Sequence, residues 1–383
     1  MNKNNNLKHA ILSASSSHRW LNCTPAPRLE SEVENKISNA ADEGTAAHNL
    51  GEYKLKKALN IKARKPKSKY DCDEMEIYTD DYANYVIEQY EKVKQTCKDP
   101  IILIEQKLDF SEYVPEGFGT GDCIIVGNGE LNIIDLKYGK GIVVDAYDNP
   151  QMKLYALGAV ELYDDLYDIK NITLTIFQPR RENISTFTIT YEELMNWAEN
   201  ELREKAELAF RGEGEFKSGE WCTFCRVSPT CRKRAYENLK LAEFEFEKPS
   251  LLEDYEIEEI INQIPHLTKW ADDIMNYVTD MAIRRGKKWQ GYKVVEGRSS
   301  RKYIDEEQVS KVATDNGFND IYKSSLIGIG DMEKLMGKVE FNEILGHLIH
   351  KPKGKLTLVP TSDKRQEVNI GNVEEEFKNT EEK

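Results

Sequence analysis

One hairpin, GTGDCIIVGNGELNIIDLKYGKG at residues 119–141, most constrains how this chain folds. The Gly-Asn-Gly triplet at 127–129 is a strong turn signal between two β-rich runs. We therefore expect residues 122–126 and 131–137 to pair as neighbouring strands. A hairpin of this kind sets the register of a sheet and places the strand ends beside each other.

The second strand of the hairpin ends in the triplet Asp135-Leu136-Lys137. Side chains at i and i+2 share a face of a strand, so Asp135 and Lys137 should point together while Leu136 enters the core. The hairpin can bring Asp122 near Asp135, and two such carboxylates repel unless a hard cation such as Mg²⁺ neutralises them. Lys137 would then hold the attacking water or neutralise transition-state charge. A D-x-K triplet also fits an ordinary surface strand, but the apolar run IIDLK argues against a solvated loop.

Helices and further strands surround this hairpin. Apolar periodicity predicts helices at 43–59, 74–97, 150–162 and 192–210. β-Rich runs predict strands at 101–108, 172–178 and 185–189. This order indicates an α/β core, residues 1–240, with a central mixed sheet flanked by helices. A helical and α+β extension is expected over 241–365, and the Glu- and Asn-rich tail 366–383 is expected to be disordered.

The acidic balance of the chain limits how it can bind nucleic acid. The formal net charge is −14, whereas phosphate contacts need Lys and Arg, so a DNA path would be a local basic strip. Residues 54–69 hold eight Lys or Arg and no acidic residue, although a solvated basic loop explains them equally well. There is no apolar run long enough for a membrane span and no secretory signal, so we expect a cytoplasmic protein.

Two helical pairs add polar side chains to this picture. Gln151 and Tyr155 lie four residues apart and so share one face of the helix that follows the hairpin. His48 and Glu52 lie one turn apart on an earlier helix, and a neutral imidazole can ligate a metal. Taken alone, each pair is more simply explained by an ordinary amphipathic helix or a packed histidine.

The complete ordered set resembles the RecB-type branch of the PD-(D/E)XK nucleases, to which AddB-type recombination nucleases and CRISPR-adaptation exonucleases belong. The set reads G-T-x-x-H (Gly44, Thr45, His48), G-x-x-D (Gly119, Asp122), D-x-K-x-G (Asp135, Lys137, Gly139) and Q-x-x-x-Y (Gln151, Tyr155). The resemblance implies a restriction-endonuclease-like core in which His48, Asp122, Asp135 and the Leu136 carbonyl hold Mg²⁺ or Mn²⁺. It also implies that Lys137 is the catalytic lysine and that Gln151 and Tyr155 orient the site or the DNA. Glu105, on the preceding strand, is a candidate partner outside the motif.

Three of the seven cysteines crowd into Cys222-x₂-Cys225-x₅-Cys231, and Cys23 is the natural fourth ligand. An odd number at uneven spacing does not suit a disulfide scaffold, whereas clustered thiolates suit zinc or an iron–sulfur cluster. Iron–sulfur members of the same nuclease branch have one cysteine before the core and three after it. The resemblance therefore implies a [4Fe–4S] cluster on these four cysteines, with a structural zinc, completed by His18 or Cys23, as the alternative.

The expected function is a metal-dependent deoxyribonuclease, more an exonuclease than an endonuclease, acting on single-stranded DNA or duplex ends. The segments 291–303 and 350–365 resemble the C-terminal part of an uncharacterised phage-associated family, which suggests recombination, replication or repair in a bacterial cell or phage-infected host. A single-strand annealing or binding protein is a candidate partner, and a homo-oligomer is compatible with the sequence. Two alternatives stay open: a catalytically quiet DNA-binding or assembly factor, and a zinc-stabilised RNA-processing enzyme.

Overall fold

A computed structural model describes residues 10–34, 39–240, 252–297, 301–322, 326–350, 352, 354, 356–360 and 365–368. The chain divides into two compact units, Met1–Trp270 and Ala271–Lys383, and the division falls inside helix α9 (Asp254–Arg285). The boundary expected near residue 240 and the extent of the extension stay predictions. Glu367, at the start of the tail expected to be disordered, pairs with Val295, and residues 369–383 lie outside the described residues.

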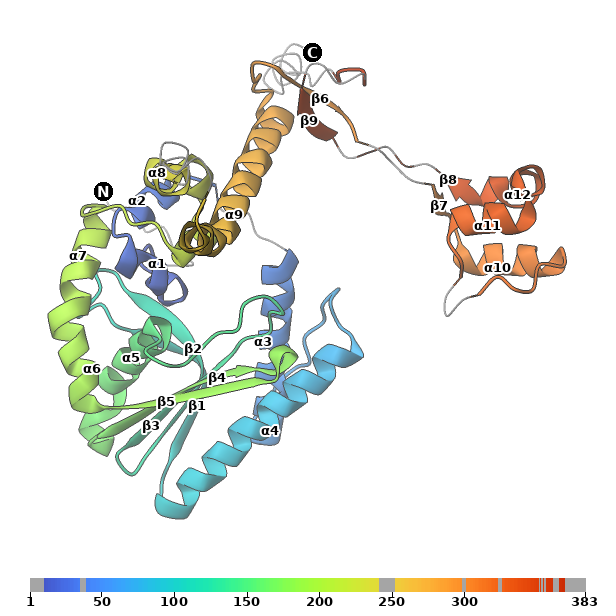
Figure 1. Ribbon diagram of the computed structural model, residues 1–383. Coiled ribbons are helices and arrows are strands. Elements are labelled where there is room, and N and C mark those ends of the chain that lie inside the picture. The colour runs from blue at the N-terminus through green and yellow to red at the C-terminus, as the bar shows by residue number, and fades with distance from the viewer. Residues whose placement is uncertain are drawn as a thin grey trace, which may run out of the picture. The chain divides into compact units, whose positions relative to one another are not determined.

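A five-stranded mixed sheet forms the centre of the first unit, with strand order β1-β2-β3-β4-β5 (Figure 1). The strands are β1 (Ile101–Asp109), β2 (Phe118–Gly127), β3 (Glu130–Leu136), β4 (Asn171–Gln178) and β5 (Asn183–Thr190). Asn128 and Gly129 have φ values of 54° and 76°, as a tight two-residue hairpin turn between β2 and β3 requires. The central mixed sheet predicted from the sequence is confirmed.

Strands β3 and β4 are parallel, while every other neighbouring pair in this sheet is antiparallel. A parallel pair needs a crossover connection, and helix α5 (Pro150–Tyr167) supplies it. The Asn149 side chain caps the start of α5 by accepting hydrogen bonds from the backbone N–H groups of Gln151 and Met152. The start of α5 is therefore fixed beside the end of β3, which is where the D-x-K triplet lies.

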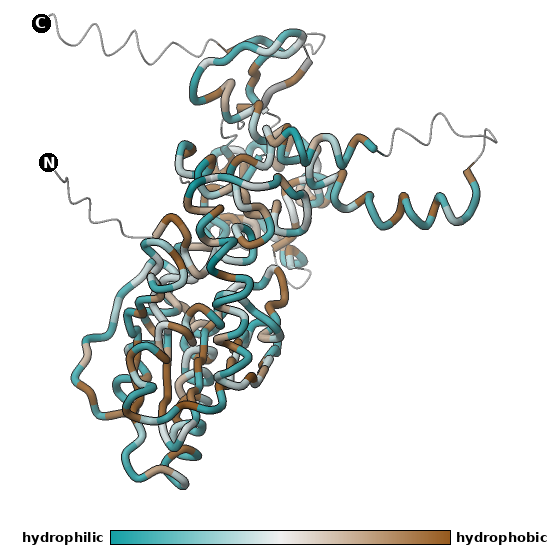
Figure 2. The backbone as a smooth tube through the Cα atoms, turned by 90° about the vertical axis from the view of Figure 1, so that its left-hand side faces the viewer, coloured by the Kyte–Doolittle hydropathy of each residue, from teal (hydrophilic) through white to brown (hydrophobic). Residues whose placement is uncertain are grey.

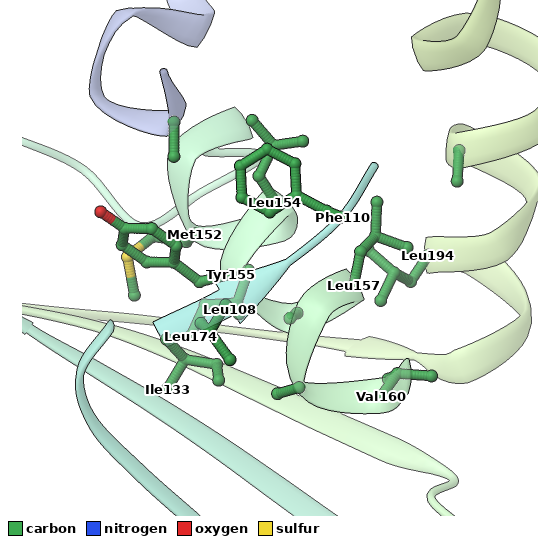
Figure 3. Packing of buried hydrophobic residues seen from close by; sticks show 14 of the residues in the cluster. Leu108, Phe110, Ile133, Met152, Leu154, Tyr155, Leu157, Val160, Leu174 and Leu194 are labelled. Atoms are coloured by element: carbon green, nitrogen blue, oxygen red, sulfur yellow. The ribbon is translucent and has the colours of Figure 1, made fainter. Parts of the chain in front are cut away.

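Helices cover both faces of the sheet. Figure 1 shows α5, α6 (Tyr191–Trp197) and α7 (Arg203–Arg211) on one side, and α3 (Asn39–Ala58) and α4 (Asp73–Thr96) on the other. Alternate strand residues enter separate cores, with Ile124 packing on the α5 side and Cys123 on the α4 side. Figure 2 shows hydrophobic and hydrophilic stretches alternating along the chain, and Figure 3 shows side chains of α5 among those of β1, β3 and β4. The flanking helices predicted from the sequence are confirmed.

Several short helices were not predicted from periodicity. In the first unit these are α1 (Ser17–Asn22), α2 (Ala26–Ser31) and α8 (Arg232–Leu239). They are only six to eight residues long, so each shows less than about two and a half turns of pattern. The expected helix 192–210 is present as α6 and α7, joined by a π-helical turn at Ala198–Leu202.

The described residues of the second unit form short strands and, after α9, three further helices. The strands pair as β6 (Tyr292–Glu296) with β9 (Leu356–Pro360), and β7 (Lys302–Tyr303) with β8 (Ile349–His350). The helices α10 (Glu306–Asp315), α11 (Ile329–Met336) and α12 (Lys338–Leu345) share a small hydrophobic core. In the described part of the chain, no helix combines the length and the hydropathy that a membrane span requires.

Candidate metal centres

The first candidate centre lies at one end of the central sheet, where α3 meets β2. His48 of α3 places its Nδ1 atom 3.1 Å from the Oδ1 atom of Asp122, across 74 residues of sequence. The other Asp122 oxygen accepts a hydrogen bond of 2.7 Å from the backbone N–H of Leu136. Asp122 is 9% exposed, so its carboxylate is held in an almost dry position by two neighbours. The structure thus brings His48 and Asp122 together, as the resemblance implied.

Asp135 and Lys137 extend this centre along the end of β3. The Lys137 Nζ atom lies 2.7 Å from the Oδ2 atom of Asp135 and donates a hydrogen bond of 3.1 Å to Gln151 Oε1. The Gln151 amide donates to Asp135 Oδ1 and to the Tyr155 hydroxyl, each at 3.1 Å. Figure 3 shows the Tyr155 ring within the core on the α5 side. Gln151 therefore links the D-x-K pair to Tyr155, because its side-chain amide forms hydrogen bonds with Lys137, Asp135 and Tyr155.

A third acid, Glu105 of β1, joins His48 and Asp122. One ligand atom from each of these three side chains lies within 4.8 Å of the others. In an octahedral Mg²⁺ or Mn²⁺ site, ligand atoms about 2.1 Å from the ion are roughly 3 to 4.2 Å apart. The three donors are therefore close to the spacing that a hard divalent cation requires. The sequence pointed to Glu105 only as a partner outside the motif.

The electrostatics of the centre show a shortage of positive charge. Burial, aided by Asp122, raises the pKa of Asp135, while His48 and Lys137 outweigh burial and hold the pKa of Asp122 below its usual value. Burial lowers the pKa of His48, but the Asp122 charge overcomes it and raises that pKa to about 9. Burial and Asp122 raise the pKa of Glu105 to about 7. The Asp122 charge thus favours a proton on the His48 imidazole, and a cation ligated by this nitrogen would have to displace that proton.

Arg180, which the sequence did not single out, clamps the surroundings of this centre. Its guanidinium pairs with Glu43 of α3 and Glu74 of α4, each at 2.9 Å, and stacks 4.5 Å from the centre of the Tyr138 ring. Tyr138 follows Lys137 and is buried. Arg180 thereby ties the end of β4 to both helices on that face. The sequence offered no signal for this, because Arg180 lies in a short turn after β4 with no motif around it.

The second candidate centre contains the four cysteines near the start and the end of the core. Cys23 follows α1, Cys222 lies in the short helix Glu220–Phe224, Cys225 follows it, and Cys231 precedes α8. The charge of Cys222 affects the pKa of both Cys23 and Cys225, and that of Cys231 affects Cys23. The structure therefore brings Cys23 beside a cluster about two hundred residues further along the chain.

The surroundings of these cysteines suit thiolate ligands. Burial raises the pKa of Cys23, whereas hydrogen bonds from the backbone N–H groups of Lys217 and Ala26 lower it. Burial likewise raises the pKa of Cys225 to about 12, although a hydrogen bond from the backbone N–H of Val227 lowers it. These inward-pointing N–H groups stabilise a sulfur that carries charge, and a bound metal supplies the charge that removes the proton.

The four cysteines are candidate ligands for either one zinc ion or an iron–sulfur cluster. Of the described side chains, no three of these cysteines place their sulfurs within 4.8 Å of one another. Around one tetrahedral zinc with Zn–S bonds of about 2.3 Å, neighbouring sulfurs would be roughly 3.8 Å apart. In an iron–sulfur cube each thiolate binds a different iron, so the sulfurs lie further apart. His18, the other candidate for zinc, instead lies 3.6 Å from the carboxylate of Glu220.

Direct contacts hold the two segments of the cysteine centre together. Glu30 of α2 is 3% exposed and accepts hydrogen bonds of 2.8 Å from Arg19 Nε and from the backbone N–H of Arg226. The Thr24 hydroxyl donates to the Glu213 carbonyl oxygen at 2.6 Å. These contacts hold the backbone near Cys23 and the backbone near Cys225 together without a bound metal.

Fold and site define a mixed α/β protein with a cluster of His and carboxylate side chains at the end of its central sheet and a separate group of four cysteines. Residues 9–366 match the family model described as "Protein of unknown function (DUF2800)", and the chain belongs to this family. One solved structure, titled "Crystal structure of SSO0001", is 13% identical over 48% of this chain and 95% of that chain, with a TM-score of 0.21.

Proposed function

We propose that this protein is a metal-dependent deoxyribonuclease with a RecB-type PD-(D/E)XK core. The observations that carry the proposal are two contacts on the paired strands β2 and β3: His48 lies 3.1 Å from Asp122, and Lys137 lies 2.7 Å from Asp135. A binding module has no need for buried carboxylates that repel one another beside an ammonium group. A phosphodiester hydrolase needs this combination, because it must hold a cation and stabilise added negative charge.

The donor set fits Mg²⁺ or Mn²⁺, since it combines carboxylate oxygens with one imidazole nitrogen. We propose that His48, Asp122, Asp135 and the Leu136 carbonyl hold the ion. When bound, it lowers the pKa of water and neutralises charge on the phosphate. Asp135 and Gln151 fix the Lys137 ammonium, so Lys137 needs no rearrangement to donate to the attacking water or a phosphate oxygen.

The cysteine centre is proposed to hold a [4Fe–4S] cluster that joins the first and last parts of the nuclease core. Its support is the mutual electrostatic influence of Cys23 with Cys222 and Cys231, together with the backbone N–H groups that hydrogen-bond to Cys23 and Cys225. A structural zinc is the competing occupant. Iron and acid-labile sulfide in anaerobically purified protein would support the cluster, and stoichiometric zinc would contradict it.

The proposed substrate is DNA that is single-stranded or has open ends, and residues 61–69 form the proposed contact with its phosphates. Lys62, Arg64 and Lys67 in this segment are exposed. Tyr70, directly after it, packs against the small core that contains Tyr138 beside the D-x-K triplet. Because of this packing, the basic segment borders the end of β3. It is the local strip that a chain of net charge −14 requires.

Neutralising this strip tests the proposed DNA path. The triple variant Lys62→Gln, Arg64→Gln and Lys67→Gln should weaken DNA binding, measured in Ca²⁺ to prevent cleavage. It should also reduce the slope of log K against log salt by about 0.7 to 0.9 for each phosphate that is no longer neutralised. The control is three exposed lysines, at positions 92, 94 and 98, near the other end of α4, about 35 Å along the helix. Equal salt slopes in the two triple variants would rule out this path.

A nuclease assay tests the main proposal. Anaerobically purified protein should degrade end-labelled linear DNA with Mn²⁺ or Mg²⁺, and Asp135→Asn or Lys137→Ala should abolish the activity. The matched control is Asp165→Asn, an exposed acid on α5 away from the centre. Comparing linear with end-blocked DNA separates exonuclease from endonuclease action. Activity that persists in both site variants would refute the assignment.

The competing function is a catalytically quiet DNA-binding or assembly factor, which the acidic net charge favours. Such a protein would bind DNA with no metal-dependent cleavage at any end structure. An RNA-processing enzyme is distinguished by offering labelled RNA beside DNA in the same assay. Each outcome assigns the protein to a different class.

A further inference from the structure

Strand β1 changes conformation at one residue, Glu105. Its neighbours Ile104 and Gln106 pair in register with Cys123 and Gly121 of β2, whereas Glu105 has a φ of +50°. This left-handed conformation is uncommon for residues other than glycine, and it is costly in the middle of a strand. The packed sheet on both sides maintains it. Glu105 lies between these two pairs on β1, as Asp122 does on β2, and its carboxylate is one of the three donors within 4.8 Å of each other.

A second, independent feature is the Tyr82 hydroxyl on the same side. Tyr82 lies in α4, is 2% exposed, and lines a small cavity together with His48, Glu105 and Asp122. Its hydroxyl has no hydrogen-bond partner among the described residues. Buried hydroxyl groups nearly always have a partner, so an unsatisfied one that faces acidic side chains indicates a missing polar occupant.

We propose that Glu105 is a direct ligand of the divalent cation, so that four side chains rather than three hold the ion. The inference rests on the proposed function in sharing His48, Asp122 and Asp135 as ligands. Glu105 approaches from β1, while Asp135 approaches from β3 on the other side of β2. A cation ligated by Glu105 and Asp122 would be a polar neighbour for the Tyr82 hydroxyl, which has no partner among the described residues.

The closeness of the two carboxylates supports this assignment, because Glu105 and Asp122 each place an oxygen within 4.8 Å of the other and of His48. In the absence of the ion, Glu105 and Asp122 repel each other, because both are carboxylates in a poorly solvated place. Glu105 is therefore expected to destabilise the ion-free protein and to stabilise the loaded protein.

The test compares Glu105→Gln with Glu52→Gln in metal binding without DNA. Glu52 lines the same cavity, but it is paired with Lys56 on its own helix, so it is a matched control. Mn²⁺ affinity, measured by calorimetry or by electron paramagnetic resonance, should fall about 10- to 100-fold in Glu105→Gln. It should change less than about twofold in Glu52→Gln. Glu105→Asn, which tolerates the left-handed backbone, should lose affinity as Glu105→Gln does.

Thermal unfolding separates a ligand from a structural residue. In chelator, Glu105→Gln should melt at or above the temperature of the unchanged protein, and added Mn²⁺ should raise its melting temperature less. Unchanged Mn²⁺ affinity in Glu105→Gln, or a larger loss in Glu52→Gln, would overturn the inference. If Glu105→Gln loses affinity while the unchanged protein cuts no DNA, the nuclease proposal fails and the ligand assignment stands. If the unchanged protein cuts DNA and Glu105→Gln keeps its Mn²⁺ affinity, the nuclease proposal stands and the ligand assignment fails.

Discussion

Replacing Cys23 by serine tests whether the cysteine centre joins the two ends of the core. Cys23 is 7% exposed, and its sulfur accepts hydrogen bonds from the backbone N–H groups of Lys217 and Ala26. Serine is nearly isosteric and its hydroxyl oxygen can accept the same hydrogen bonds. In protein stripped of its metal or cluster, the change should therefore cost at most about 1 kcal/mol, the net value of one hydrogen bond.

The cost should be larger in loaded protein, because serine is a poor ligand for a soft metal. Structural metal sites with four ligands contribute about 10–16 kcal/mol in small zinc domains, so one ligand accounts for roughly 3 kcal/mol. Glu30 and Thr24 still hold the two segments together, and the chain should fold. The expected result is a free energy of unfolding lowered by about 3 kcal/mol in loaded protein and by no more than about 1 in stripped protein.

Urea unfolding under anaerobic conditions, followed by circular dichroism, measures both differences. The control is Cys72→Ser, an exposed thiol outside the cluster, which should change stability by less than about 0.5 kcal/mol. Metal and sulfide content are measured on the same samples. The reasoning fails if Cys23→Ser and Cys72→Ser lose equal stability when loaded. It also fails if Cys23→Ser loses as much in stripped as in loaded protein, because the cysteine would then be only a packing residue.

Three further predictions concern stability, and urea unfolding checks each. Arg180→Ala should cost about 3 kcal/mol, since it breaks two ion pairs of a side chain only 8% exposed, and Arg180→Lys should recover less than half. Gly158→Ala should destabilise the protein by about 1–3 kcal/mol, because the new Cβ would lie 2.8 Å from Leu108 Cβ. This loss should exceed the gain from the better helix propensity of alanine. A gain in stability would contradict the packing. Thr190→Ala should cost about 1 kcal/mol by removing the capping box with Glu193, and an unchanged midpoint would show that the cap is dispensable.

The local features of the core were predictable from sequence alone. β-Rich runs and the Gly-Asn-Gly turn predicted β2 and β3, and long periodic stretches predicted α3, α4 and α5. The same periodicity implied that Asp135 and Lys137 would share a face, and their charged groups lie 2.7 Å apart. These features depend on residues close together in the chain, so composition and spacing determine them.

The helices in the second unit were not predictable in this way. Helices α10, α11 and α12 are eight to ten residues long, so their patterns are too short to distinguish from loops. Their stability comes from packing around a shared core that includes Phe341 and Met332. Such a core is a property of the assembled unit and not of any one segment.

The chemistry of both centres depended on tertiary structure. The sequence contained His48, Asp122 and Cys23, but only the packing of α3 against the sheet places His48 beside Asp122, and only the contacts of α2 place Cys23 near Cys222. The positive φ of Glu105 and the Arg180 clamp have no signature in the chain. Residue types and short-range periodicity are set by covalent order, whereas convergence across long stretches of chain is set by which hydrophobic faces pack together.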